Sequence, residues 1–421
     1  MLKSSISTVL TSVAMAGVAL VSAIMTARAL GVEGRGVLAA ALLALSLSRG
    51  AGQLGLGQSF SLLVRRREIG NPSRRALSSS GVVALSGGLI SFSLIALAPV
   101  TDDPGLGVSI VFTAVIASVA DFQVNALRID SSLKTFNYAR MGFPALTTTL
   151  IGASWWWLGD LTPSSVVICT TVSALTISLA TAPILTRAAR AYARPNATPV
   201  PWRRYLTLAA SFQGLALLGL LLNNVDMIYM MFIGSAEAFG LYSAAYGLSR
   251  LISPLPLAVG NALFARYVGH SRDDQEAVET ALLVFRLLFL PLALIGCIGT
   301  ALAPFAIPAL LGKEFEEAWP IFSILLFEAA LGGLAYLLAQ HFQAEGRVGI
   351  ILKRHLASFV PILCLIWFIP RDRPAIGLAC LILLSAGVRL LMTLRQFKQV
   401  YPLQPIMYLP RMRDIAQLRN L

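Results

Sequence analysis

Two arginines lie well inside long apolar segments of this sequence, where a permanent charge is costly. Arg49 follows Gly36 in one apolar run, and Arg250 follows Gly240 in another. At 1.5 Å of rise per residue, both are expected about 15–20 Å from the outer end of their segments. A guanidinium does not lose its proton, so at that depth it requires an anion or water. Because it also matches phosphate oxygens in a bidentate manner, the two arginines favour an anion-binding site.

Two carboxylates in apolar segments offer an alternative, since charges inside a membrane commonly pair with each other. Asp226, on the segment before Arg250, is expected about 12 Å deep and within reach of it. Glu328 is expected at a similar depth, where it would neutralise Arg49. A pair that opens when substrate or a proton arrives would act as a gate. Asp226 or Glu328 would then couple transport to H⁺ or Na⁺, and we expect no other cofactor.

Other polar residues repeat along the same segments and are expected to line a water-filled cavity rather than a helix contact. They recur at helical spacing on two segments, which hold Ser118, Asp121, Asn125 and Arg128, and Glu328, Tyr336, Gln340 and Gln343. We assign Asn224 and Tyr242 to the same lining. Pro254 and Pro256 follow Arg250 closely and are expected to break or kink their segment and to serve as a hinge.

The composition places these residues in a membrane. The chain has 421 residues, of which 57% are hydrophobic and 13% charged, against about 25% charged in soluble domains. Apolar stretches of about 20 residues recur, each long enough to cross a bilayer core about 30 Å thick. The four cysteines and three histidines show no metal-ligand spacing, and no Walker A sequence is present. The sequence therefore predicts an all-α polytopic protein of the cell membrane without a metal site.

Twelve membrane spans are expected. They lie near residues 5–30, 37–64, 76–99, 106–127, 141–159, 163–187, 205–233, 238–266, 280–303, 318–343, 348–369 and 374–397. Lysine and arginine are concentrated in alternate connections, and the opposite side holds only Arg28, Arg35, Lys313, Arg371 and Arg373. The positive-inside rule then places both termini in the cytoplasm. The net charge of +13 is thus explained by topology and lipid contact, and nucleic acid is not expected as a partner.

The chain repeats itself faintly. Gly31, Glu33 and Gly36 parallel Gly234, Glu237 and Gly240 with one residue inserted, and Phe122-Gln123 parallels Phe342-Gln343. Chance similarity between apolar segments is the alternative. A repeat predicts two six-helix lobes, residues 1–192 and 205–400, with the substrate site between them. A proline-rich linker, 193–204, joins them, and a basic cytoplasmic tail, 401–421, follows.

Several of these motifs resemble the Wzx-type flippases of the MOP superfamily, which also contains MATE exporters and lipid II flippases. The similarity runs from about residue 26 to residue 353. It is carried in order by Arg28-Ala-Leu-Gly31, Gly55-Leu-Gly57-Gln58, Asn224-Val-Asp226, Gly240-Leu-Tyr242, Leu311-Gly312 and Gln343-Ala-Glu-Gly346-Arg347. Many relatives have fourteen spans, so this chain departs from the family in stopping at twelve, which puts a lipid groove built by extra helices in doubt.

The resemblance implies a flippase that moves polyprenyl-diphosphate-linked oligosaccharide from the inner to the outer leaflet. The two lobes would alternate access around a cationic cavity, with polysaccharide polymerase or assembly proteins as further partners. On this hypothesis Arg49 and Arg250 hold the diphosphate, and Arg28 and Arg286 guide it at the rims. Two rivals remain. A MATE-like drug or metabolite antiporter would require a mainly acidic and aromatic cavity. A membrane polysaccharide polymerase or ligase would require a large catalytic outer loop, and the predicted outer loops are short, so we expect no enzyme.

Overall fold

The computed structural model describes residues 2–69, 71–98, 101, 103–129, 134–192, 200–267 and 275–400. Over these residues the chain is helical and contains no strand. The helices group into two compact units, Met1–Gly240 and Leu241–Leu421. Most of the linker predicted at 193–204 and the whole of the tail predicted at 401–421 lie outside the described residues.

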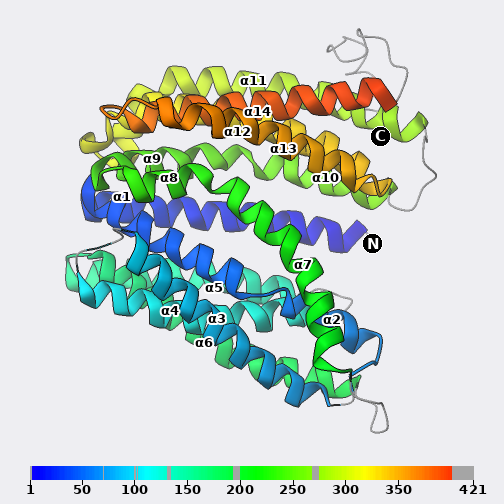
Figure 1. Ribbon diagram of the computed structural model, residues 1–421. Helices are drawn as coiled ribbons and strands as arrows, with labels where there is room; N and C mark the ends of the chain where they lie inside the picture. The colour runs from blue at the N-terminus through cyan, green and yellow to red at the C-terminus, as the bar shows by residue number, and fades with distance from the viewer. Residues whose placement is uncertain are drawn as a thin grey trace. The chain divides into compact units, whose positions relative to one another are not determined.

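The first unit is built around α4. It contains α1 (Leu2–Gly52), α2 (Leu56–Arg65), α3 (Pro72–Leu97), α4 (Pro104–Ala126), α5 (Lys134–Leu158), α6 (Pro163–Ala191), α7 (Trp202–Asn223) and α8 (Val225–Ile233). Helix α4 packs against α1, α2, α3 and α6, and α3, α4, α5 and α6 run side by side in Figure 1. A core beneath it joins Leu56 and Phe60 of α2 to Phe122 of α4 and Tyr205 of α7. Helix α7, predicted to open the second lobe, therefore packs with the first unit here.

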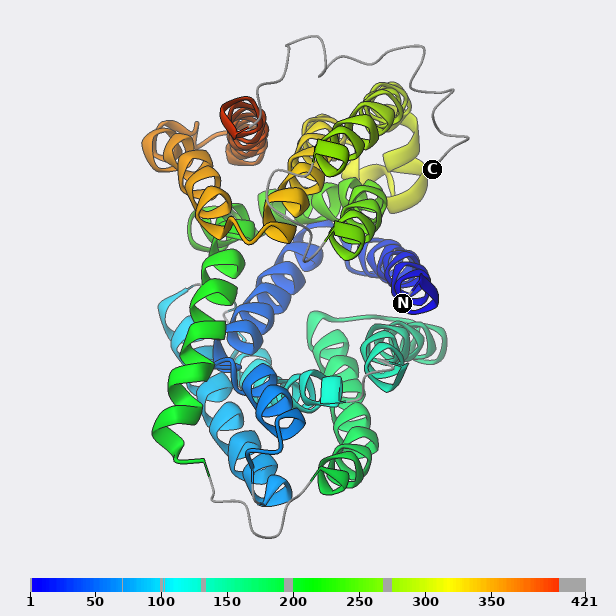
Figure 2. The same ribbon diagram turned by 90° about the vertical axis from the view of Figure 1, so that its right-hand side faces the viewer.

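The second unit is built around α12. It contains most of α9 (Ala236–Ser249), then α10 (Pro254–Tyr267), α11 (Gln275–Leu311), α12 (Ala318–Ala344), α13 (Val348–Leu365) and α14 (Pro374–Val400). Helix α12 packs against α10, α11, α13 and α14, which Figure 2 shows nearly end-on. Its buried residues Leu334, Leu338 and Phe342 form a core with Phe397 of α14. In each unit one central helix is therefore enclosed by protein rather than by lipid.

Nine helical stretches of the described chain are long and apolar enough to cross a membrane, and the protein is a multi-pass membrane protein. All twelve predicted spans fall on helices. Two of them share the continuous stretch Ala14–Arg65, which bends at Gly31, where φ is 66°. The fifth predicted span lies on α5, which is not one of the nine stretches. The eighth predicted span is divided between the shorter helices α9 and α10 and is not one of them either. The count of twelve stays a prediction.

Three predicted spans are interrupted where polar residues cluster. The second breaks between Gly52 and Leu56, just after Arg49. The seventh breaks at Asn224, between α7 and α8. The eighth breaks at Arg250, which begins the 3₁₀ turn Arg250–Ile252 between α9 and Pro254. A break leaves helix-end carbonyl and amide groups without intrahelical partners, and inside a membrane those groups must be satisfied by protein or by water in a cavity.

The two repeated glycine motifs touch each other within the first unit. A Cβ added to Gly36 would overlap the carbonyl oxygen of Ala236 and lie 3.0 Å from the Gly240 nitrogen. A Cβ added to Gly240 would overlap the carbonyl oxygen of Val32 and lie 3.2 Å from the Gly36 nitrogen. The contact is reciprocal, because each glycine faces the carbonyl four residues before the other. Only residues without a side chain permit this backbone approach.

Candidate functional site

Arg49 forms a bidentate ion pair with Asp121 inside the first unit. Its Nε lies 2.8 Å from Asp121 Oδ2, and its Nη2 lies 2.7 Å from Asp121 Oδ1. The side chains are 24% and 32% exposed, so the pair is accessible to small molecules. The guanidinium also lies over the ring of Phe143, 4.9 Å from its centroid. Such two-point geometry is the one that a guanidinium also uses with phosphate.

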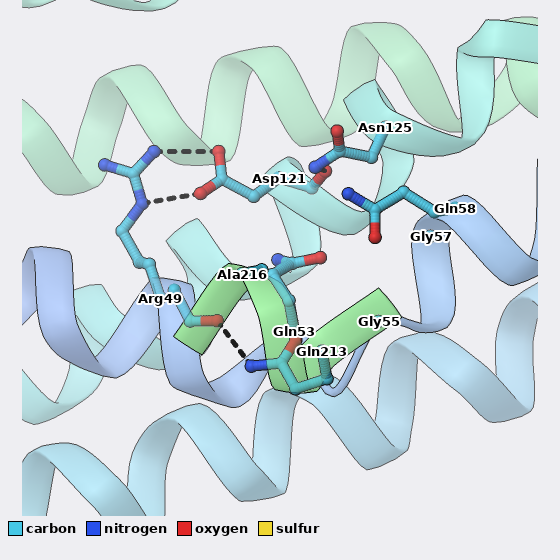
Figure 3. Close-up of a pocket in the computed structure, with 10 residues that line it drawn as sticks. Arg49, Gln53, Gly55, Gly57, Gln58, Asp121, Asn125, Gln213 and Ala216 are labelled. Carbon is cyan, nitrogen blue, oxygen red and sulfur yellow. Dashed lines mark hydrogen bonds and ion pairs between the residues drawn. The ribbon is translucent and has the colours of Figure 1, made fainter. Parts of the chain in front are cut away.

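A cavity of about 230 Å³ opens beside this pair (Figure 3). Its lining is polar for a site between membrane helices and comes from α1, α2, α4, α7 and the turn between α1 and α2. The lining consists of Arg49, Gly50, Gln53, Gly55, Gly57, Gln58, Asp121, Asn125, Gln213 and Ala216. In Figure 3, Arg49 lies at one end of the group and Gln58 and Asn125 at the other.

The turn at 53–55 exists because side chains and close packing stabilise the end of α1. Gln213 Nε2 donates to the carbonyls of Gly50 and Ala51 at 3.0 and 3.1 Å. Ser86 Oγ donates to Gly52 O at 2.7 Å. Gly55 has φ of 68° and leaves no room for a Cβ against Ala209 O, so a residue with a side chain would be strained there. These contacts fix the break just beyond Arg49.

The second unit holds a separate charged cluster around Glu328. Its Oε2 lies 2.6 Å from Arg250 Nη1, and its Oε1 lies 3.7 Å from Arg389 Nη2. The carboxylate side chain is only 4% exposed. Gly332 makes room for the second arginine, since a Cβ there would lie 3.1 Å from Arg389 Nη2. One enclosed carboxylate on the central helix is thus shared by two guanidinium groups.

Arg354 adds a further positive charge in the same unit. The residue is 4% exposed. Its Nη1 donates to Ala335 O at 2.9 Å and lies 3.4 Å from Thr393 Oγ1, so it joins α13 to α12 and α14. Among the described residues, no carboxylate forms an ion pair with it. Burying an uncompensated guanidinium is costly, and backbone and hydroxyl oxygens offset that cost only in part.

Two of the expected partners differ from those that the structure shows. Arg49 pairs with Asp121 rather than with Glu328, and Glu328 pairs with Arg250 and Arg389. The expected pairs were inferred from depth alone, which does not show which helices pack together: α1 packs against α4, and α12 packs against the turn that Arg250 begins. Arg389, to which no functional role was assigned from the sequence, also contacts the buried carboxylate.

The remaining candidates lie in varied surroundings. Asp226 is buried in the first turn of α8, and Asn224 Nδ2 donates to Leu220 O at 2.7 Å. Tyr242 and Gln340 are buried in the structure. Arg28 is exposed on α1, and Arg286 is half-buried on α11. Pro254 opens α10, and Pro256 packs against Gly333 of α12. Their roles in lining, guiding and hinge motion stay predictions.

Sequence reasoning missed the roles of three residues. Asp121 was placed on a polar face but not opposite Arg49. Gln53 and Gln213 were assigned no function. A signal for Gln213 existed, because a glutamine between Phe212 and Gly214 at the start of an apolar run requires a polar partner inside the membrane.

Solved structures with this fold are membrane transporters. The lipid II flippase MurJ, in an inward closed conformation, is 12% identical, with a TM-score of 0.72 over 98% of this chain and 92% of that one. An inward-facing multidrug resistance MATE family transporter of the MOP superfamily is 15% identical, with a TM-score of 0.67 over 92% and 95% of the two chains. A mutant of the Vibrio cholerae MATE transporter VcmN is also 15% identical, with a TM-score of 0.59 over 96% and 100%.

At the level of sequence, no curated protein matches the chain. A family model does: the one described as polysaccharide biosynthesis protein matches residues 1–264, which is more than half of the sequence. The resemblance noted from the short motifs is thereby confirmed. This chain is a multi-pass membrane protein with the MurJ and MATE fold, and it belongs to the polysaccharide biosynthesis protein family.

Proposed function

We propose that this protein is a flippase that moves polyprenyl-diphosphate-linked oligosaccharide from the inner to the outer leaflet. The observation that carries the proposal is Arg49, a partly exposed guanidinium in a polar cavity between membrane helices, in a chain of the polysaccharide biosynthesis family. A diphosphate headgroup must cross hydrocarbon, where charge is unfavourable. An arginine in a wet cavity offers that headgroup the charge and the bidentate geometry it needs.

The diphosphate reaches Arg49 by replacing Asp121. Both ligands present two oxygens to the same face of the guanidinium, so the exchange preserves two charge-assisted hydrogen bonds. Because each member of the pair is about a quarter to a third exposed, water can solvate the displaced carboxylate. Asp121 thereby neutralises the guanidinium of Arg49 between transport cycles and separates from it when the substrate binds.

The pair between Arg250 and Glu328 serves the same cycle as a gate. Glu328 is enclosed, so neutralisation of its charge by a bound H⁺ or Na⁺, rather than exposure to water, is the route by which it releases the arginine for the diphosphate. The coupling ion on this proposal is H⁺ or Na⁺, with Glu328 and the buried Asp226 as the coupling groups. Arg28 and Arg286 guide the headgroup, Asn224, Tyr242 and Gln340 line its route, and Pro254 and Pro256 form a hinge.

The proposed topology has twelve spans in two six-helix lobes, with both termini in the cytoplasm. The basic connections between spans support this orientation. The protein then works by alternating access and makes or breaks no covalent bond of its substrate. Its partners would be the lipid-linked glycan, the bilayer and polysaccharide polymerase or assembly proteins.

A second candidate is an ion-coupled antiporter for drugs or metabolites. It is favoured by the MATE transporter with a TM-score of 0.67 and by the neutralisation of Arg49 by Asp121. A neutral, acceptor-rich cavity would accept a cation more readily than an exposed arginine would. The two candidates differ in substrate charge, which makes them separable by transport.

Headgroup translocation in proteoliposomes tests the proposal. Wild type should move a polyprenyl-diphosphate-linked sugar to the opposite leaflet, and Arg49→Ala and Arg250→Ala should each slow it at least tenfold. Arg203→Ala, which removes an exposed charge outside both clusters, is the matched control and should transport normally. Undiminished transport in both site variants would rule out the arginine mechanism. Movement of a cationic dye instead of the lipid would support the antiporter.

A further inference from the structure

Four carboxamide side chains line the cavity beside Arg49, more than binding a diphosphate requires. Gln53 lies in the turn after α1, Gln58 on α2, Asn125 on α4 and Gln213 on α7. The four residues come from four different segments of the chain and meet at one cavity. Their convergence indicates that the cavity recognises a polar ligand.

Three of these side chains use an amide donor within the protein, although Gln53 and Asn125 each keep their second N–H available. Gln53 Nε2 donates to Ser118 O at 3.0 Å, and Asn125 Nδ2 donates to Asp121 O at 2.9 Å. Gln213 Nε2 donates to the end of α1. Their carbonyl oxygens receive no hydrogen bond from the described residues. The cavity therefore offers carboxamide oxygens as acceptors together with free amide N–H groups on Gln53, Asn125 and Gln58, and the amide of Gln58 makes no hydrogen bond within the described chain.

This balance of donors and acceptors distinguishes between classes of ligand. A phosphate group has only acceptors, so it fits the Arg49 end and would leave the carboxamide oxygens without a donor. A metal cation accepts no hydrogen bond, so it would leave the free amide N–H groups without a partner. Hydroxyl groups both donate and accept. A neutral polyol is therefore the class that satisfies both the donors and the acceptors of the carboxamides.

The volume of the cavity matches one sugar ring rather than a whole oligosaccharide. Its 230 Å³ is below the range of about 300–1,000 Å³ typical of pockets for drug-sized ligands. In a lipid-linked glycan the first sugar is attached directly to the diphosphate. An anion at Arg49 would place that sugar toward Gln58 and Asn125, which lie at the other end of the same group (Figure 3).

We propose that this cavity is a subsite for the sugar attached to the diphosphate, with Gln58 and Asn125 as its specificity-determining residues. The inference rests on the proposed flippase function and deepens it by separating recognition of sugar from recognition of phosphate. Gln53 and Gln213 hold backbone carbonyls in place and shape the floor of the subsite. Gln58 is the clearest probe, since its side chain makes no hydrogen bond within the described residues.

The test compares two lipids on the purified full-length protein in nanodiscs. One is polyprenyl diphosphate without sugar, and the other is the same lipid carrying a single hexose or N-acetylhexosamine. Gln58→Met and Asn125→Leu remove the hydrogen-bonding groups at similar size. Each should weaken binding of the glycosylated lipid about three- to tenfold, the effect of one neutral hydrogen bond, and leave binding of the bare diphosphate lipid unchanged. Gln399→Met, at an exposed glutamine of α14, is the matched control.

The outcomes separate this inference from the function beneath it. Loss confined to the glycosylated lipids supports the sugar subsite. Equal loss for both lipids, or no loss for either, overturns it and leaves the flippase proposal standing if wild type still binds both. Wild type that binds neither lipid would overturn the proposed function itself. Melting temperatures of the variants within a degree or two of wild type confirm that the folds are comparable.

Discussion

Asp121 meets Arg49 with both of its carboxylate oxygens, at 2.7 and 2.8 Å, across 72 residues of sequence. Glu328 meets Arg250 at 2.6 Å in the other unit. In both cases the carboxylate lies on the central helix, α4 or α12, and the arginine lies where a neighbouring helix is interrupted. In both units, a permanent positive charge between membrane helices is therefore paired with a carboxylate of the central helix.

The two ion pairs should differ in their contribution to stability. Asp121→Asn leaves Arg49 beside a cavity that water can enter, so we expect a loss of about 1–3 kcal/mol. Glu328→Gln leaves Arg250 and Arg389 without their shared, enclosed carboxylate, and we expect a loss of about 3–5 kcal/mol. Thermal unfolding of both variants in the same detergent measures the difference. Equal melting temperatures would show that the exposure of the pairs does not govern their energetics.

The geometry of the first pair predicts that Arg49→Lys will not substitute for arginine. A lysine ammonium keeps the charge but has no planar fork for two parallel hydrogen bonds. We expect lipid translocation to fall about tenfold while the protein stays folded. The measurement is transport in proteoliposomes beside the Arg203→Lys control. Full activity of Arg49→Lys would mean that charge alone suffices and that bidentate contact is unimportant.

The hydrogen bonds of Gln213 predict that its substitution will have a purely structural effect at the edge of the cavity. Gln213→Met removes the donor that serves the Gly50 and Ala51 carbonyls, and unsatisfied buried acceptors cost about 1–3 kcal/mol. We expect a lower melting temperature and similar losses of binding for glycosylated and bare diphosphate lipids. Gln58→Met should show the opposite pattern, with normal stability and selective loss. Identical behaviour of the two variants would contradict the assignment of Gln213 to the structure of the cavity and of Gln58 to recognition of the sugar.

The orientation of the chain is testable by cysteine labelling. In a background without the four native cysteines, Arg203→Cys should react with an impermeant maleimide only from the cytoplasmic side. Arg371→Cys, at an exposed position before α14, should react only from outside. Labelling of both positions from one side would contradict the twelve-span topology.

Apolar length predicted most of the helices, because it is a local property of the sequence, while the count of twelve spans and the orientation drawn from lysine and arginine stay predictions. Each predicted span falls on a helix, and the residues Asp121 and Asn125, assigned to a polar face by their spacing, do line a cavity. Partner choice was not predictable, because it depends on which helices pack together. The pairing of Arg49 with Glu328 was inferred from depth alone, whereas α1 packs against α4, which carries Asp121.

Arg354 shows a second limit of prediction from the sequence. Next to Lys353 and near Arg347 it had the sequence pattern of a cytoplasmic basic connection. The structure instead buries it on α13, with its guanidinium on the backbone of α12. A charged residue near a helix end is read by default as solvent-facing, and only the packing of three helices shows otherwise.

The contact between Gly36 and Gly240 has a consequence for variation within the family. Since each glycine faces the carbonyl four residues before the other, a methyl group on either side meets the same obstacle. Homologues should therefore covary at these two positions, with both small where the backbones touch and both larger where the helices have separated. A homologue with alanine at one site, glycine at the other and an unchanged helix spacing would break that coupling.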